Sequence, residues 1–469
     1  MGRYRISCIT GQACLGLALI VSVNFLTPWL PAAQAAEAHN VAPRASSADL
    51  AKIEAKRDQL FNQMMADPTN LDVAFEYAGL SSQAGDLEGA IATLERMLIY
   101  APGLPRLQLE LGVLYYRLGA YETAKTYFSN ALQAPNVPDE VRHKVDTYLA
   151  AIHERTLVDQ VSGTITTGLR WQSNANGGPE DRSVRTTLFP VPLLLDDGST
   201  ADSDINGFLA TNLFYSHDLA SQGDRFEASL QTYGALYAQH DEFNTGFAEL
   251  HIGPTFDLNR FDIADATLST YAIASGTMLH GDPYLLSGGL GISALKAVDG
   301  KTRLTIGTEY RREDFRDSDL RPTASDYTGD RYRVWTGFEH ALTSDLLLTG
   351  TLFGEGKDAK VGYQSFSQVG VTLGLTYSFA SPIAKGGAGP WTASLTVGHA
   401  LTHFDKPDYL YSFDEAERDR ETFVEGGLIV PVADDWAVQA LAGYRNVASN
   451  YSIHAYHNVS ASLGVIRKF

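Results

Sequence analysis

The feature that most constrains the fold is the alternation of apolar and polar residues through the last two thirds of the chain. Val369, Val371, Leu373 and Leu375 occupy every second position, and Gly, Thr and Ser occupy the positions between them. A period of two residues places alternate side chains on opposite faces of a β-strand. Such segments run for about 10 to 14 residues and are separated by Gly, Asp, Asn and Pro.

Segments of this kind are typical of transmembrane β-barrel strands, which turn apolar residues to lipid and polar residues to the lumen. Their number is even, as expected for a bacterial single-chain barrel. The predicted strands are residues 160–171, 205–216, 225–239, 245–258, 265–279, 284–298, 301–313, 329–342, 345–355, 365–379, 391–403, 421–432, 435–446 and 454–469.

The predicted connections alternate in length, which is the expected difference between short periplasmic turns and longer outer loops. The short ones are 220–224, 259–262, 299–300, 343–345 and 434–435, and the long ones are 173–204, 314–329 and 405–420. The long connection 380–390 falls where a short turn is expected, and it is the exception to this alternation. A soluble all-β protein is the alternative, but strands in globular proteins average about 5–6 residues.

The last strand ends on Phe469. A terminal aromatic residue on the final strand resembles the recognition signal of the outer-membrane barrel assembly machinery. We therefore expect that machinery as a partner and Phe469 as the barrel-assembly signal.

Residues 48–157 change to helical periodicity and contain two units 34 residues apart. Gly85, Ala90 and Leu94 of the first unit correspond to Gly119, Ala124 and Phe128 of the second. Small residues at helix crossings and a proline at the exit, here Pro102 and Pro135, resemble the tetratricopeptide repeat. Helices at 48–65 and 139–155 are predicted to cap the array.

Tetratricopeptide repeats stack into a curved array with a concave surface that usually binds protein. Four apolar or aromatic residues on the first helix of each repeat are candidates for contact with a client protein, namely Phe75, Leu109, Val113 and Tyr116. The alternative is that these side chains pack within the array.

The first 35 residues follow the plan of a secretory signal peptide. Arg3 and Arg5 precede an apolar stretch, and a small-x-small site ends at Ala35. An uncleaved membrane anchor is the alternative. Both cysteines, Cys8 and Cys14, fall in this segment, so no disulfide is expected beyond it. The expected organisation is a signal peptide at 1–35, a linker at 36–47, a periplasmic repeat domain at 48–157 and an outer-membrane barrel at 158–469.

The composition argues against nucleic-acid binding and gives no sign of catalysis. The formal net charge is -19, and binding to nucleic acid requires Lys and Arg to neutralise phosphate. No hydrolase, zinc-protease or phosphate-loop motif is present, so we expect no enzyme activity, metal or cofactor. His399 and His403 stand four apart in a predicted strand, where ordinary polar strand residues are the simpler interpretation. Acidic outer loops could contact outer-membrane lipids and lipopolysaccharide through divalent cations.

A set of charged residues falls on the polar phase of the predicted strands. They could pair with one another inside the lumen or line a path for a translocating chain, and pairing is the simpler interpretation. The lumen-facing candidates are Glu227, Glu249, Arg303, Glu309, Arg331, Arg333, Glu339, Glu425 and Arg445.

The sequence thus predicts an α+β multidomain chain, with an N-terminal α-helical tetratricopeptide solenoid followed by a C-terminal antiparallel transmembrane β-barrel of about 14 strands. This arrangement resembles the surface lipoprotein assembly modifier (Slam) family over nearly the whole chain. Locally, residues 168–176 (GLRWQSNAN) resemble the first strand of that family, and residues 443–450 (GYRNVASN) with Tyr456 and residues 464–469 resemble its last hairpin.

The resemblance implies a Gram-negative outer-membrane translocator that delivers client lipoproteins or secreted effector proteins to the cell surface. The periplasmic repeats would engage the client, and transport would use the lumen or a seam between residues 160–171 and 454–469. An exopolysaccharide export porin is the main alternative, although such porins carry much longer repeat arrays. A structural or adhesive surface barrel is the other alternative.

Overall fold

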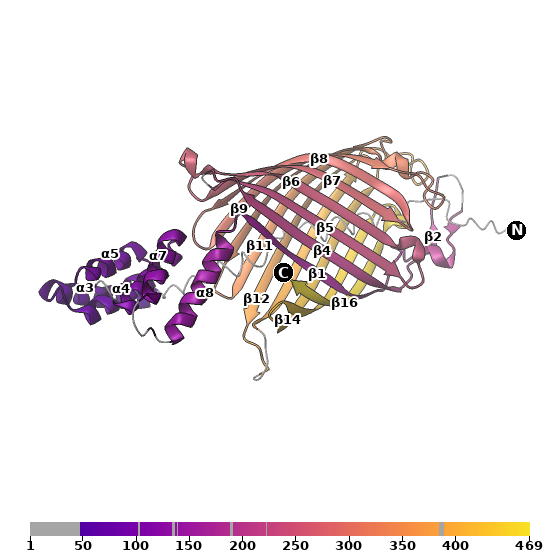
Figure 1. Ribbon diagram of the computed structural model, residues 1–469. Coiled ribbons are helices and arrows are strands. Elements are labelled where there is room, and N and C mark those ends of the chain that lie inside the picture. Colours follow the sequence, from indigo (N-terminus) through magenta and orange to yellow (C-terminus); the bar gives the residue numbers. More distant parts are fainter. Residues whose placement is uncertain are drawn as a thin grey trace. The chain divides into compact units, whose positions relative to one another are not determined.

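The computed structural model (Figure 1) describes residues 47–101, 104–133, 137, 139–187, 191–221, 223–383 and 389–469. These residues form two compact units, a helical one that ends at Val158 and a β-sheet one that begins at Asp159. The expected signal peptide, residues 36–46 of the linker, Pro102 and Pro135 lie outside the described residues.

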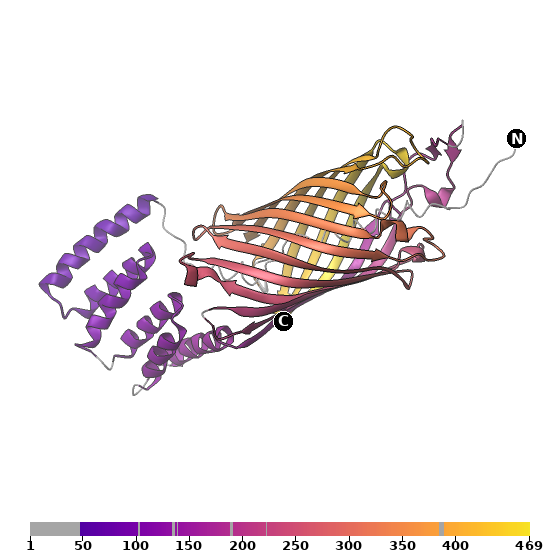
Figure 2. The same cartoon turned by 90° about the horizontal axis from the view of Figure 1, so that it is seen from above.

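The second unit is a closed antiparallel β-barrel, and Figure 2 shows its long strands side by side and tilted. Its fourteen strands are β1 (Asp159–Gln172), β4 (Asp204–Asp218), β5 (Arg225–Tyr237), β6 (Thr245–Asp257), β7 (Ala266–Leu279), β8 (Asp282–Ala297), β9 (Thr302–Phe315), β10 (Gly329–Ala341), β11 (Leu346–Ala359), β12 (Phe366–Phe379), β13 (Trp391–Phe404), β14 (Arg418–Ala433), β15 (Trp436–Ser449) and β16 (Tyr456–Lys468).

Each barrel strand pairs with its neighbours in the chain, and β1 closes the sheet by pairing with both β4 and β16. The predicted fold class is therefore confirmed, including the strand number. A separate ribbon of β2 (Ser183–Val184) and β3 (Leu193–Leu194) lies in the first long connection. The connections also carry the 3₁₀ turns η2 (Asp197–Ser199), η3 (Asp241–Phe243), η4 (Leu258–Phe261), η5 (Ala324–Tyr327) and η6 (Ser452–His454).

The connections define two ends of the barrel, which we call the loop end and the turn end. The loop end carries residues 173–203, 238–244, 280–281, 316–328, 360–365, 405–417 and 450–455. The turn end carries residues 219–224, 258–265, 298–301, 342–345, 380–390 and 434–435, and β1 begins there. The length difference is not uniform, because only residues 280–281 separate β7 from β8, whereas residues 380–390 separate β12 from β13.

The two faces of the sheet differ in chemistry. Large apolar side chains on the outward phase are exposed, for example Leu209 at 50%, Ile306 at 62% and Leu373 at 50%. Outward aromatic residues lie toward both ends, with Trp171 and Tyr444 toward the loop end and Trp436 toward the turn end. A closed barrel with an apolar outer band between aromatic residues is the structure that β-strands require to span a bilayer.

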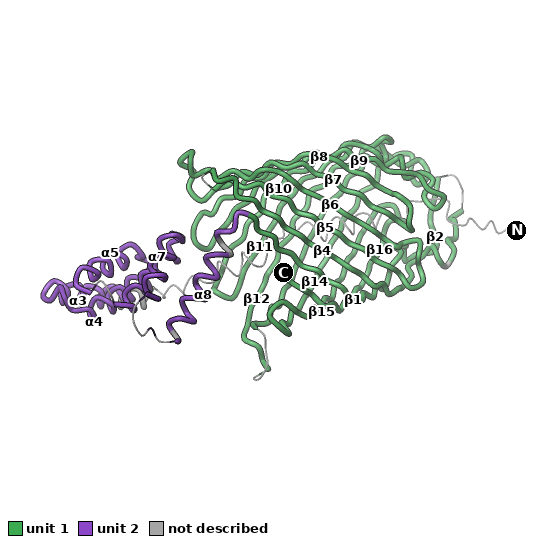
Figure 3. Tube along the Cα trace, viewed as in Figure 1, with its two compact units in different colours: residues 1–29, 159–469 green, residues 30–158 purple. Residues whose placement is uncertain are grey.

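The first unit, purple in Figure 3, is an array of six described helices. They are α3 (Ser47–Ala66), α4 (Leu71–Ala84), α5 (Leu87–Leu98), α6 (Pro105–Arg117), α7 (Tyr121–Leu132) and α8 (Asp139–Arg155). Across the residues that the structure describes, no helix is both long and apolar enough to cross a membrane.

Local signals in the sequence set the ends of these helices. The side chains of Asn70 and Asp86 accept hydrogen bonds from backbone N–H groups in the first turns of α4 and α5, which is the usual role of an N-cap residue. Gly85 and Gly119 follow α4 and α6 with φ of 89° and 82°. A left-handed residue at this point favours glycine because other side chains are strained there.

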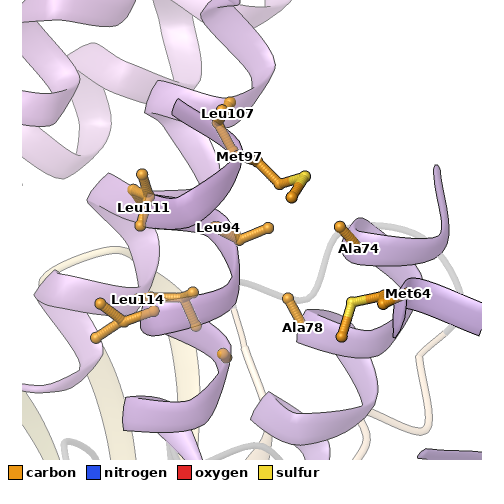
Figure 4. Packing of buried hydrophobic residues seen from close by; sticks show 10 residues of the cluster. Met64, Ala74, Ala78, Leu94, Met97, Leu107, Leu111 and Leu114 are labelled. Atoms are coloured by element: carbon orange, nitrogen blue, oxygen red, sulfur yellow. The ribbon is translucent and has the colours of Figure 1, made fainter. Parts of the chain in front are cut away.

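The core of the helical unit reproduces the 34-residue repeat. Ala90 and Ala124 are fully buried, and Leu94 and Phe128 are buried at the equivalent place one repeat apart. Figure 4 shows Leu94 and Met97 of α5 packed with Leu107 and Leu111 of α6. A second core joins α6, α7 and α8.

Candidate functional site

The nine charged residues predicted to face the lumen all lie on the inward phase of their strands. In β9, for example, Arg303 and Glu309 alternate with the exposed outward residues Leu304, Ile306 and Tyr310. The inward phase also carries charged residues that the sequence did not single out, among them Arg311, Glu313, Glu355 and Lys357.

Eight of these charges form two ion-pair clusters on the inner side of the sheet between β6 and β11. Glu313 lies at the centre of the larger cluster, on β9–β11, and is 3% exposed. Its carboxylate oxygens lie 3.1 Å from Arg331 Nη1 and 2.8 Å from Lys357 Nζ. Arg331 Nη2 also lies 2.6 Å from Glu355 Oε1, and Arg333 Nη1 lies 3.8 Å from the other oxygen of Glu355.

Arg311 is the centre of the second cluster, which reaches from β9 to β6 across three strand interfaces. Its guanidinium contacts Glu249 of β6 at 2.6 Å and Glu309 of its own strand at 2.8 Å. The hydroxyl of Tyr271 in β7 donates to Glu309 Oε1 at 2.9 Å. Removing one partner from either cluster would leave another charge buried and unpaired, which is costly.

The remaining predicted charges lie apart from these clusters. Arg303 and Glu339 form a looser pair, 3.9 Å apart. Glu227 contacts Arg225 at 3.3 Å and accepts a hydrogen bond from Thr255. Arg445 pairs with Glu421 and stacks over Phe423, and Glu425 occupies the next inward position of β14.

The wall formed by β12 and β13 has no charged residue on its inward phase. Thr372, Gly374 and Thr376 of β12 face Gly398, Thr396 and Ser394 of β13 across the register. The lumen is therefore lined by a charged, paired wall and, next to it, by a wall without charges, where the rings of Phe353 and Phe423 lie over Gly370 and Gly398.

The seam between β1 and β16 is the place where the two ends of the sheet meet. Its register covers Thr164–Gln172, whereas β1 pairs with β4 from Asp159 onward. Two glycines, Gly168 and Gly464, face each other in the middle of the seam. A Cβ atom on Gly168 would lie 2.2 Å from the backbone oxygen of Leu463, so the two strands approach too closely for a side chain there.

The loop end of the seam is held by buried side chains from the sequence motif at residues 168–176. The backbone N–H of Asn174 donates to Asn458 Oδ1 at 3.1 Å, and Asn458 Nδ2 donates to Gln172 Oε1 at 3.2 Å. Asn176 accepts from the backbone of Gly178 and Asp202 and folds the loop over this end. At the turn end, the predicted assembly signal Phe469 exchanges backbone hydrogen bonds with Gly163 at 2.9 and 3.2 Å.

The four predicted client-contact residues differ in their burial. Phe75, Val113 and Tyr116 are half-buried at the edge of the helical cores. Leu109 is 7% exposed and packs in the core with Phe128, Val145 and Ile152. The expectation of a contact role for Leu109 is corrected accordingly, because capping helix α8 covers that face.

The helical unit also contains a polar cluster that the sequence did not single out. Tyr115 and Tyr127 stack with ring centroids 5.3 Å apart, and both hydroxyls donate to Glu95, at 2.6 and 3.1 Å. The hydrogen bond to Glu95, together with burial, raises the pKa of Tyr115 to about 12. Within the described part of the chain, no group of three or more His, Cys, Asp or Glu side chains is placed to hold a metal ion.

Comparison with known proteins supports the helical assignment. The tetratricopeptide repeat family model matches residues 81–141. No curated protein sequence matches the chain.

Among solved structures, the chain is similar to a bacterial polysaccharide outer membrane secretin, with 9% identity over 67% of this chain and 99% of that one, and a TM-score of 0.34. It is similar to an anion-selective porin from Comamonas acidovorans, with 10% identity over 66% and 99% and a TM-score of 0.32. Its helical part is similar to the type III secretion chaperone SycD of Yersinia enterocolitica in complex with a peptide of the translocator YopD, with 16% identity over 23% and 84% and a TM-score of 0.22. All three similarities are distant. By its own architecture, the molecule is a tetratricopeptide-repeat domain joined to a fourteen-stranded transmembrane barrel.

Proposed function

We propose that this chain is an outer-membrane translocator that delivers client lipoproteins or secreted effector proteins to the cell surface. The observation that carries the proposal is the direct covalent link between a protein-binding class of repeat and a membrane barrel. Helix α8 ends at Arg155 and β1 begins at Asp159, at the turn end of the barrel. Short turns face the periplasm in outer-membrane barrels, so this connection favours a periplasmic repeat domain.

The repeat domain would bind the client through the half-buried residues Phe75, Val113 and Tyr116. Partly exposed aromatic side chains contribute large contact area at low entropic cost, which is why they are common in protein-binding surfaces. Arg106 stacks over the ring of Phe75 with 4.4 Å between its guanidinium carbon and the ring centroid. An arginine held over an aromatic ring presents charge and apolar surface side by side to an extended peptide.

The barrel would then carry the client across the membrane. The uncharged wall of β12 and β13 gives a sliding surface without strong binding sites, and the charged wall of β9–β11 that adjoins it is already neutralised by its own pairs. A path of this kind suits a polypeptide of mixed composition, because no single charge type is favoured along it. No nucleotide-binding motif is needed for this role, and the driving force would come from the client or its chaperones.

Cross-linking of a client in transit tests the proposal. A photo-reactive residue is placed at Thr372 on the inward face of β12, with Leu373 on the outward face as the matched control. The probe is a lipoprotein encoded beside the gene for this chain, expressed in living cells. Cross-links at position 372 that disappear in the Phe75→Glu/Tyr116→Glu variant are expected.

Two outcomes would contradict the proposal. One is the absence of client cross-links at position 372 while the lipoprotein still reaches the surface. The other is cross-linking to an exported polysaccharide at position 372, which would support the export-porin alternative.

A further inference from the structure

A basic patch lies on the outward face of the barrel at its loop end. It consists of Arg418 and Arg420 of β14 and His399 and His403 of β13, all exposed. The register pairs His403 with Arg418 and places His399 opposite Thr422, so that the four residues lie on one face of two adjacent strands. The two histidines are the pair four residues apart that the sequence left without a role.

The arginines of the patch are free of ion pairs among the residues that the structure describes. Asp419 and Glu421 alternate with them along β14 but occupy the inward phase, and Glu421 pairs there with Arg445. Arg312 differs from these two arginines in its ion pairing. It is also outward and near the loop end, but its guanidinium contacts Asp330 at 3.1 Å. Two exposed guanidinium groups without a carboxylate partner on the outer wall are available to an anion from outside the chain.

The patch lies at the depth of lipid head groups. Tyr444 of β15 is an outward aromatic residue, and its register partner on β14 is Val424. Tyr and Trp mark the boundary between the hydrocarbon and the polar head groups. Arg420 is four residues nearer to the loop end than Val424, so it lies just outside the hydrocarbon band, where lipid phosphates are found.

An apolar strip continues from the patch toward the turn end. Its outward residues Leu395 and Val397 of β13 are 47% and 39% exposed, and Val424 of β14 is 38% exposed. One amphipathic molecule could therefore place its phosphate on the arginines and its acyl chains on this strip. A protein partner would need to match both a charged head-group zone and a lipid-facing surface, which favours a lipid as the occupant.

We propose that the basic patch binds the phosphate groups of an anionic glycolipid of the outer leaflet, of the lipid A type. The planar guanidinium donates two parallel hydrogen bonds to a phosphate group. A hydrated head group without phosphate cannot easily replace this pair of bonds. The choice of leaflet rests on the orientation given under the proposed function. The lipid site itself does not depend on client transport.

Lipid binding to the purified full chain tests this site. The protein is held in a neutral detergent, and the probes are bisphosphorylated lipid A, dephosphorylated lipid A and inorganic phosphate, with bound lipid counted by native mass spectrometry. Wild type should retain bisphosphorylated lipid A. The Arg418→Gln/Arg420→Gln variant should bind it roughly 25-fold more weakly, because each basic residue near a charged membrane surface contributes a few-fold in affinity.

Arg312→Gln is the matched control, because it removes an outward arginine at the same end that already has a carboxylate partner. It should bind the lipid as wild type does. If the double glutamine variant does not form a barrel, Arg418→Lys/Arg420→Lys keeps the charge, loses the bidentate geometry and should show an intermediate loss.

Equal binding by wild type and the folded double variant would overturn the lipid site. So would full competition by inorganic phosphate, which would indicate a site for the free ion, or equal retention of dephosphorylated lipid A. None of these results involves a client, so failure here is distinct from failure of the proposed function.

Discussion

The backbone N–H of Asn174, at the end of the first barrel strand, donates a 3.1 Å hydrogen bond to the side chain of Asn458 in the last strand. Asn174 is 2% exposed and Asn458 is 5% exposed, so this link and the bond from Asn458 to Gln172 are shielded from water. They hold the loop end of the β1–β16 seam. Fewer residues of β1 pair with β16 than with β4.

Asn458→Ala should destabilise the barrel by about 1–3 kcal/mol, because it leaves a buried N–H and a buried amide oxygen without partners. This change is measured on a gel as the temperature at which the protein no longer migrates as the compact, folded barrel. Asn446→Ala is the control, because Asn446 lies on the outward face of β15 and should have little effect. Equal stability of Asn458→Ala and wild type would refute a holding role for the seam contacts.

Locking the seam should block delivery of an acylated client. The acyl chains of a lipoprotein must reach the membrane, and a closed barrel wall separates them from it. Thr166 faces Ile466 across the seam, and directly paired strand residues lie within disulfide range. We therefore expect the Thr166→Cys/Ile466→Cys variant to lose surface delivery when oxidised and to regain it on reduction.

The control for the locked seam places the same type of cross-link one interface away, between Thr166→Cys and Ala210→Cys of β4. This lock should not affect delivery. If the oxidised seam variant delivers its client at the wild-type level, the client passes entirely through the lumen.

Removing one member of the charged wall should destabilise the barrel strongly, because its partners are left buried without compensation. Glu313→Ala leaves Arg331 and Lys357 without a shared partner in a buried network, a change that typically costs about 3–5 kcal/mol. Glu339→Ala should cost less, because its contact with Arg303 is 3.9 Å long and both side chains are partly exposed. Urea unfolding of the purified barrel, followed by intrinsic fluorescence, compares the two. A smaller loss for Glu313→Ala than for Glu339→Ala would contradict the network.

The loops around His454 should respond to pH. Burial alone would lower the pKa of His454, but the charge of Glu417 and its hydrogen bond raise that pKa above its usual value. A raised folded-state pKa means that the contact stabilises the loops fully below about pH 6.5, the unfolded value. The stabilisation is lost as the pH rises through the folded-state pKa of His454.

Hydrogen exchange of residues 405–417 and 450–455 measures this effect. Exchange, corrected for its intrinsic pH dependence, should accelerate as the pH is raised from about 6.5 through the folded-state pKa of His454. Glu417→Gln should remove the pH response. A response of the same size in Glu417→Gln would show that another group is responsible.

The barrel could be predicted because its signal is long and local. Alternation over each strand, as at residues 365–379, is set by which face meets lipid, and nothing in the tertiary structure overrides it. The strand ends were less accurate, because β11 continues to Ala359 and β14 begins at Arg418. Charged residues near strand ends, such as Lys357, have the composition of a loop, although here they point into the lumen.

The arrangement of the site was less predictable. That Arg303 and Glu309 face inward follows from their phase. That Arg311 contacts Glu249 depends on the register across three interfaces, which no local pattern encodes. The same limit explains Leu109. Helical periodicity places Leu109 on one face of α6, and only the packing of α8 shows that this face is covered.

The most direct test of the account is the surface exposure of a lipoprotein encoded beside this chain's gene, measured by protease accessibility on intact cells. The account predicts that deletion of this chain leaves the lipoprotein protected, that the full chain restores its cleavage, and that Phe75→Glu/Tyr116→Glu restores it poorly although the barrel is assembled. Unchanged cleavage after deletion would contradict the account and leave sugar export or a structural surface role as the function.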